Sequence, residues 1–159
     1  MNRNPLRFLL LPLLALTMIG CPKQAAKLAM TLQAAPNVNP DPGGKSLSVV
    51  VRVYQLKDKG RLESADYNAI WKLDKDTLSD DFLAVQERVV QPGTQEMLEI
   101  QTNPMAKYVG VVALFRNPSG DSWRRLVPIG GKSRAIGGKT QTISLTLRDQ
   151  GIELVSAGK

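Results

Sequence analysis

The run Tyr108-Val109-Gly110-Val111-Val112-Ala113-Leu114-Phe115 decides the fold class, because it is apolar on both faces of an extended chain. A strand of this kind is typical of the middle of a sheet that is covered on both sides. The turn formers Asn117-Pro118-Ser119-Gly120-Asp121 follow it, and residues 123–129 then predict the return arm of a hairpin. The run therefore predicts a central strand in a β-sheet protein.

Alternating apolar and polar residues predict further strands on both sides of this run. The clearest patterns cover residues 27–34, 47–56 and 142–147, and weaker ones cover residues 85–90 and 96–101. Residues 152–154 either extend the strand at 142–147 or pair with it. Seven or so short strands separated by turns, with one helical insertion, predict an all-β chain folded as a two-sheet β-sandwich.

The helical insertion is expected after residue 63. Ser64 is a candidate N-cap, and apolar residues recur at three- and four-residue spacing from Tyr67 to Trp71. Asp74 is expected to begin a second helical segment, because acidic residues in a first turn interact favourably with the helix dipole.

The first 20 residues have the features of an export signal that ends at a lipid-attachment site. Arg3 and Arg7 precede an apolar run at residues 8–16, and Gly20 stands directly before Cys21, the only cysteine of the chain. The apolar run is much shorter than the roughly 20 residues that span a bilayer. A small residue before a lone cysteine resembles the lipobox of bacterial lipoproteins, which implies a covalent lipid on Cys21.

These features divide the chain into a lipoprotein signal peptide (residues 1–20), a lipidated tether (21–26) and one β-sandwich domain (27–156). The five residues between Cys21 and Lys27 reach about 17 Å when extended. The domain is therefore expected to stay close to the membrane, and a partner of this domain is expected to come to the membrane. Without residues 1–20 the chain has 19 basic and 14 acidic residues, which are interspersed and argue against a nucleic-acid surface.

The composition excludes the commonest catalytic groups. The chain has no histidine and its one cysteine is assigned to lipid, so Ser-His-Asp and Cys-His arrangements are excluded. Three Gly-Lys-Ser/Thr triplets lack the earlier glycine of a phosphate-binding loop, and the acids between Asp74 and Asp81 lack the glycine of a calcium loop. A Ser-Lys hydrolase would need a lysine whose pKa is shifted by burial, which a sequence does not reveal. We expect a non-enzymatic protein with no catalytic residue, no metal and no cofactor other than the lipid on Cys21.

Several segments together resemble the TssJ (SciN) family, the outer-membrane lipoprotein of the type VI secretion system. They are Asn39-Pro40-Asp41, Val50-Val51-Arg52-Val53-Tyr54-Gln55-Leu56-Lys57, Ala65-Asp66-Tyr67, the run from Tyr108 to Arg116, and Trp123-Arg124. The resemblance implies a transthyretin-like sandwich with extra helical elements. It also implies that the protein anchors the membrane complex of the secretion system at the outer membrane.

The resemblance further implies a partner and a partner-binding loop. Members of the family bind the periplasmic C-terminal domain of TssM, within a larger TssJ-TssM-TssL complex, and the loop that joins the first two strands is implicated. In this chain the implied partner-binding residues are Asn37, Val38, Asn39, Pro40, Asp41, Pro42, Gly43, Gly44 and Lys45. Pro22 stands where Asp would be the usual signal for retention in the inner membrane, so we expect a lipid-anchored outer-membrane protein whose domain faces the periplasm.

A second interpretation is a periplasmic lipoprotein that binds a small ligand or an envelope carbohydrate, since sandwiches commonly bind sugars on loops or sheet faces. Its aromatic platforms would be Tyr54, Trp71, Tyr108 and Trp123. The apolar patterns around these residues favour a place in the core for most of them.

Overall fold

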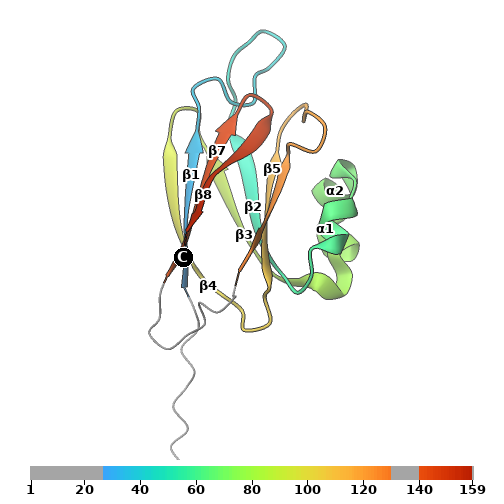
Figure 1. Cartoon of the computed structure of the whole chain (residues 1–159). Coiled ribbons are helices and arrows are strands. Elements are labelled where there is room, and N and C mark those ends of the chain that lie inside the picture. The colour runs from blue at the N-terminus through green and yellow to red at the C-terminus, as the bar shows by residue number, and fades with distance from the viewer. Residues whose placement is uncertain (1–26, 130–139, 159) are drawn as a thin grey trace, which may run out of the picture.

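The computed structural model describes residues 27–129 and 140–158, and two four-stranded sheets face each other across one core (Figure 1). The first sheet has the order β4-β1-β7-β8 and consists of β1 (Lys27–Ala34), β4 (Gln95–Gln101), β7 (Gln141–Arg148) and β8 (Gly151–Gly158). The second has the order β3-β2-β5-β6 and consists of β2 (Val49–Leu56), β3 (Phe82–Val90), β5 (Tyr108–Leu114) and β6 (Arg124–Pro128). The predicted two-sheet sandwich is confirmed; the signal peptide, Cys21 and the tether lie outside the described residues.

The strands pair in one pattern with a single exception. β1 and β7 run parallel, whereas the other five strand pairs are antiparallel. β8 pairs with β7, which decides between the two alternatives for residues 152–154. Consecutive strands β1 and β2 belong to different sheets, so the loop that joins them crosses one end of the sandwich.

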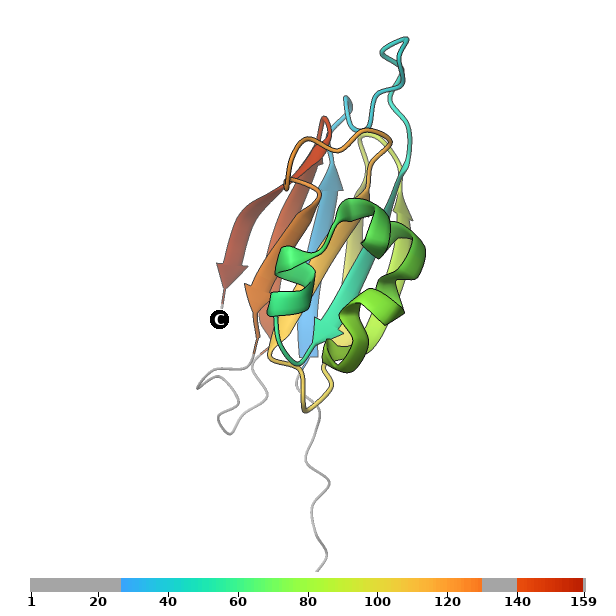
Figure 2. The ribbon, with the colours of Figure 1, turned by 90° about the vertical axis from the view of Figure 1, so that its right-hand side faces the viewer.

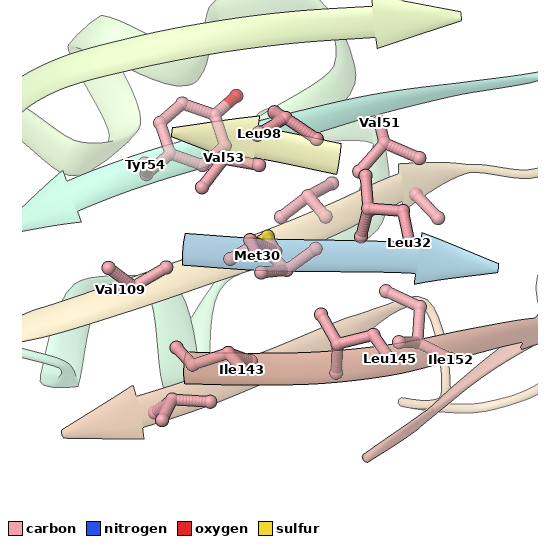
Figure 3. Close-up of a cluster of buried hydrophobic side chains, with 14 of the residues drawn as sticks. Met30, Leu32, Val51, Val53, Tyr54, Leu98, Val109, Ile143, Leu145 and Ile152 are labelled. Atoms are coloured by element: carbon pink, nitrogen blue, oxygen red, sulfur yellow. The ribbon is translucent and has the colours of Figure 1, made fainter. Parts of the chain in front are cut away.

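The core lies between the sheets and is built from alternate residues of the strands (Figure 3). Met30 and Leu32 of β1 are at most 1% exposed, as are Val51 and Val53 of β2 on the facing sheet. The alternation in the sequence therefore predicted the buried face of these strands. Burial of such a side chain stabilises the fold by about 1.5–3 kcal/mol.

The run that is apolar on both faces is β5, which lies between β2 and β6. Its inner face contributes Val109 and Val111 to the core, and its outer face is covered by helix. Gly110 lies on this outer face, where an added Cβ would clash with the side chain of Leu62. A residue without a side chain is needed here so that the helix can approach the sheet.

The helices α1 (Gly60–Ser64) and α2 (Tyr67–Leu78) and the 3-10 turn η1 (Ser79–Asp81) cover the outer face of the second sheet (Figure 2). None of the helices in the described ranges is long and apolar enough to cross a membrane. The outer face of the first sheet has no such cover (Figure 1).

Polar side chains of β2 fasten α2 to the second sheet. The Arg52 guanidinium donates to the backbone carbonyls of Ile70 (3.3 Å) and Trp71 (3.2 Å). The Tyr54 hydroxyl donates to the Asp74 carboxylate at 2.8 Å. Burial, together with this hydrogen bond, raises the pKa of Tyr54 well above its usual value.

The helical region differs from the sequence prediction at its start. Ser64 does not cap α2; it is the last residue of α1, and its hydroxyl donates to the Gly60 carbonyl at 2.9 Å. The N-cap is Asp66, whose carboxylate accepts the N–H two residues further on at 2.8 Å. The backbone leaves the helical conformation at Leu73, so the predicted second segment from Asp74 follows a kink.

Candidate partner-binding loop

Residues 35–48, here called the β1–β2 loop, connect the two sheets at one end of the sandwich. Figure 1 shows the loop as the cyan projection at the end opposite to Lys27, where β1 begins. The seven residue steps of β1 make a strand about 23 Å long, at about 3.3 Å each. The loop therefore projects away from Lys27, where the described residues begin.

The base of the loop, Val38 and Asn39, is buried. Val38 is 0% exposed and Asn39 is 5% exposed. The Asn39 side chain donates to the Ser48 carbonyl (2.9 Å) and accepts the N–H of Arg116 (2.8 Å), while its backbone N–H donates to the Asp149 carbonyl (2.6 Å). One residue thus joins the loop to the β5–β6 connection through its side chain and to the β7–β8 connection through its backbone.

The conformation of Asn39 explains why asparagine stands there. Its φ is +50°, in the left-handed region that most side chains avoid and asparagine tolerates. Its carbonyl also accepts the N–H of Leu47 at 3.2 Å. Leu47 consequently belongs to the loop, and β2 begins two residues later than predicted, at Val49.

The tip of the loop, residues 41–45, is a turn closed by its own hydrogen bonds. The Asp41 carboxylate accepts the N–H groups of Gly43 and Lys45, both at 2.9 Å, and its backbone N–H donates to the Lys45 carbonyl at 2.9 Å. Gly44 has a φ of +83°, which a glycine adopts without strain. A β-bridge between Pro40 and Ser46 closes the neck below the tip. The loop is therefore an ordered projection.

The nine predicted partner-binding residues differ in how far they reach the surface. Asn37, Pro42, Gly43, Gly44 and Lys45 are exposed, Pro40 and Asp41 are half-buried, and Val38 and Asn39 are buried. The Asn37 amide is already engaged, because it donates to the Asp149 carboxylate at 2.6 Å. The surface that a partner can contact consists mainly of residues 40–45, and Val38 and Asn39 support it from below.

Sequence reasoning missed the residues that hold the base. The Arg116 N–H reaches Asn39 from 77 positions away in the chain, and Asp149 lies still further along. The Tyr67 hydroxyl donates to the carbonyl of Phe115, next to Arg116, at 2.5 Å, and burial raises the pKa of Tyr67. No local pattern connects these positions; the available signal was the Asn-Pro pair at residue 39.

The four aromatic residues considered as ligand platforms do not form one site. Tyr54 and Trp123 are in the core and half-buried Tyr108 packs against it, as expected for most of the four, whereas Trp71 is 49% exposed. A depression of about 350 Å³ beside the β1–β2 loop is lined by Gln33, Ala34, Ala35, Pro36, Gly93, Thr146 and Arg148, without an aromatic side chain. This depression therefore offers the carbohydrate-binding interpretation no aromatic platform.

Metal-binding groups are also lacking in the part of the chain that the structure describes: no three His, Cys, Asp or Glu side chains gather there. Asp74, the first of the acids between residues 74 and 81, accepts the Tyr54 hydroxyl and lies 3.5 Å from Arg52. That carboxylate has a structural role, because it helps to hold α2 on the sheet.

A comparison with models of known protein families identifies the family of this chain. The family model described as type VI secretion lipoprotein, VasD, EvfM, TssJ, matches residues 26–150. A search of curated protein sequences finds no match.

Three similar solved structures are named for type VI secretion proteins. The T6SS lipoprotein TssJ1 from Pseudomonas aeruginosa is 27% identical, with a TM-score of 0.74 over 85% of this chain and 98% of that chain. A chain in a structure of the type VI membrane complex is 29% identical, with a TM-score of 0.70 over 84% of this chain and 100% of that chain. A chain in the structure of the T6SS protein TssM C-terminal domain from EAEC is 27% identical, with a TM-score of 0.67 over 82% of this chain and 98% of that chain.

Proposed function

The chain belongs to the TssJ (SciN) family of type VI secretion lipoproteins, and on this basis we propose that it links the secretion membrane complex to the outer membrane by binding the periplasmic C-terminal domain of TssM. The β1–β2 loop is the proposed contact, and a lipid on Cys21 is the proposed anchor. The protein acts as a scaffold and not as an enzyme.

The observation that carries this proposal is the ordered, exposed tip of the β1–β2 loop. Its turn is closed by Asp41, and its base is fixed by the hydrogen bonds of Asn39. A loop that already has its bound shape loses little conformational entropy when a partner binds, so more of the contact energy contributes to affinity.

The position of the loop also suits a link between a membrane and a distant partner. A tether of about 17 Å and a strand of about 23 Å together allow the tip to stand several tens of ångströms from the lipid. The partner can therefore bind at some distance from the outer membrane, while the force between them passes along β1.

The comparisons support TssM as the partner. A chain of this fold occurs in the structure named for the TssM C-terminal domain, and the present chain covers 98% of it while using 82% of its own residues. That chain therefore has nearly the length of the domain described here. Another chain of this fold occurs in the type VI membrane complex.

Purification of the acylated protein from envelope, with identification of the proteins that accompany it, tests the partner. We expect TssM to be recovered in amounts comparable to the bait. Recovery of other envelope proteins without TssM contradicts the proposal.

Replacement of the lipid-bearing residue tests the anchor. With Cys21→Ser, we expect the protein to leave the outer-membrane fraction and secretion to be lost, because one domain without its lipid has no stable membrane attachment. Cys21→Ser protein that still sediments with the outer membrane and supports secretion would rule out lipid anchoring as the mechanism.

A further inference from the structure

We infer that the end of the sandwich opposite to the β1–β2 loop docks on an anionic phospholipid surface through Met105, Lys27 and Lys107. The inference rests on the proposed attachment at Cys21 and goes beyond it. A lipid tether limits only the distance of the domain from the membrane, whereas docking also sets its orientation. In the docked orientation the β1–β2 loop points into the periplasm.

The connection between β4 and β5, residues 102–107, forms this end of the molecule. It crosses from the first sheet to the second, and it reaches furthest among the coloured segments at the end where β1 begins (Figures 1 and 2). The tether continues from Lys27 at the same end. The five residues between Cys21 and Lys27 therefore hold Lys27 within about 17 Å of the lipid, and the connection begins beside Lys27.

Met105 presents an apolar side chain on a fixed turn of this connection. The side chain is 58% exposed, while the Met105 N–H donates to the Asn103 side chain at 2.9 Å. The N–H groups of Ala106 and Lys107 donate to the carbonyls of Asn103 and Leu56, both at 2.9 Å. A single exposed methionine is ordinary on a protein surface; this one is held on a turn close to the membrane.

Exposed lysines lie at the two ends of the connection that carries Met105. Lys27 pairs in register with Gln101, the last residue of β4, so it lies directly before the connection, and Lys107 ends it. Lysine near an anionic membrane surface gains electrostatic energy, and its aliphatic part lies along the lipid while the ammonium group meets the phosphates.

Most acidic residues at this end are on the helical side, but exposed Glu99 of β4 lies beside Lys27, two residues before Gln101, with which Lys27 pairs. Asp81 lies 3.5 Å from Arg61, and Asp58 accepts the N–H of Gly60 at 2.8 Å, while Asp80 is exposed on η1. Lys27 and Lys107 against Glu99 leave a small excess of positive charge beside the connection, which favours contact with lipid there.

Tethering makes a weak contact sufficient. A domain held on a short tether meets the membrane at a high effective concentration, so docking becomes an intramolecular event. One apolar side chain and two lysines would bind a membrane poorly by themselves, but they can select one orientation of a domain that is already attached.

Lipid photocrosslinking tests the docking. The chain from Cys21 onward is coupled through its single thiol to a maleimide phospholipid in vesicles of phosphatidylcholine and phosphatidylglycerol that also contain a diazirine phospholipid. We expect about tenfold more adducts on residues 102–107 than on the tip of the β1–β2 loop. Equal adducts at the two ends overturn the inference.

Matched variants identify the groups responsible. Met105→Ser is expected to reduce the adducts by about half or more, whereas Met97→Ser, at a methionine 80% exposed on β4, leaves them unchanged. Lys107→Glu and vesicles without phosphatidylglycerol should each reduce them, whereas Lys45→Glu should not. Equal effects of the two methionine variants, or of the two lysine variants, overturn the inference. Because the coupling is chemical, this result is independent of whether cells acylate Cys21.

Discussion

The base and the tip of the β1–β2 loop are neighbours in sequence, but their surroundings are opposite. Asn39 at the base is buried and bonded to two other segments of the chain, whereas the tip at residues 41–45 is mostly exposed and bonded mainly to itself. The difference indicates that one part of the loop serves stability and the other serves recognition. Substitutions in the base should therefore lower stability most, and substitutions in the tip should mainly weaken partner binding.

The largest effect on stability is expected from Asn39→Ala. The change leaves the Ser48 carbonyl and the Arg116 N–H without their partner, at about 1–3 kcal/mol each, and it places alanine at a φ of +50°. We expect the free energy of unfolding, measured by urea denaturation, to fall by about 3–5 kcal/mol. Asn39→Gly removes only the backbone strain and should recover about 1 kcal/mol of this loss. A loss below about 1 kcal/mol for Asn39→Ala contradicts the assigned role of the base.

Asp41→Ala should have a smaller effect on stability. The carboxylate organises the tip by accepting two N–H groups, but both can turn to water when it is removed. We expect a loss of about 1 kcal/mol in the free energy of unfolding and faster hydrogen exchange confined to residues 41–45. Hydrogen exchange that also increases at Ser48 or Arg116 would mean that the tip and the base are one cooperative unit. This result would contradict their separate roles in recognition and stability.

The smallest effect is expected from pH, through Tyr67 near the base. Burial raises the pKa of Tyr67, so the folded protein keeps a proton that the unfolded chain loses near its usual pKa of about 10. Stability is therefore fully present below pH 10 and declines as the pH rises above it. Tyr67→Phe should weaken this decline, measured as the change of the unfolding midpoint between pH 9 and 11, while the raised pKa of Tyr54 leaves part of it. An unchanged decline excludes Tyr67 as a contributor.

The strands of the sandwich could be predicted from sequence because alternation follows directly from which face is buried. Leu28, Met30 and Leu32 alternate with half-buried Ala29 and Thr31 and are all in the core. The start of α2 could not, because the predicted N-cap, Ser64, belongs to a separate short helix, α1. Ser64 bonds back to Gly60 inside α1, and Asp66 caps α2. The choice between them depends on how the chain packs over β5.

The sequence indicated which residues form the partner-binding loop, but not how this loop is folded or where it points. Pro40, Pro42, Gly43 and Gly44 indicated a loop, and the family resemblance indicated its use. Nothing local showed that Val38 is buried within this loop. The direction of the loop, away from Lys27, also depends on how β1 is placed in the sheet, which residue patterns alone do not give.

The most direct test of the central claim is the affinity of the folded domain for the TssM C-terminal domain, measured by calorimetry with Pro42→Ala/Lys45→Glu. Both side chains are exposed at the tip, and Gly43 and Gly44 keep the turn. We predict binding about tenfold or more weaker, with the free energy of unfolding changed by less than about 1 kcal/mol. Lys107→Glu, at the opposite end, should bind as the unchanged domain does. Equal affinity of the tip variant and the unchanged domain would contradict the account.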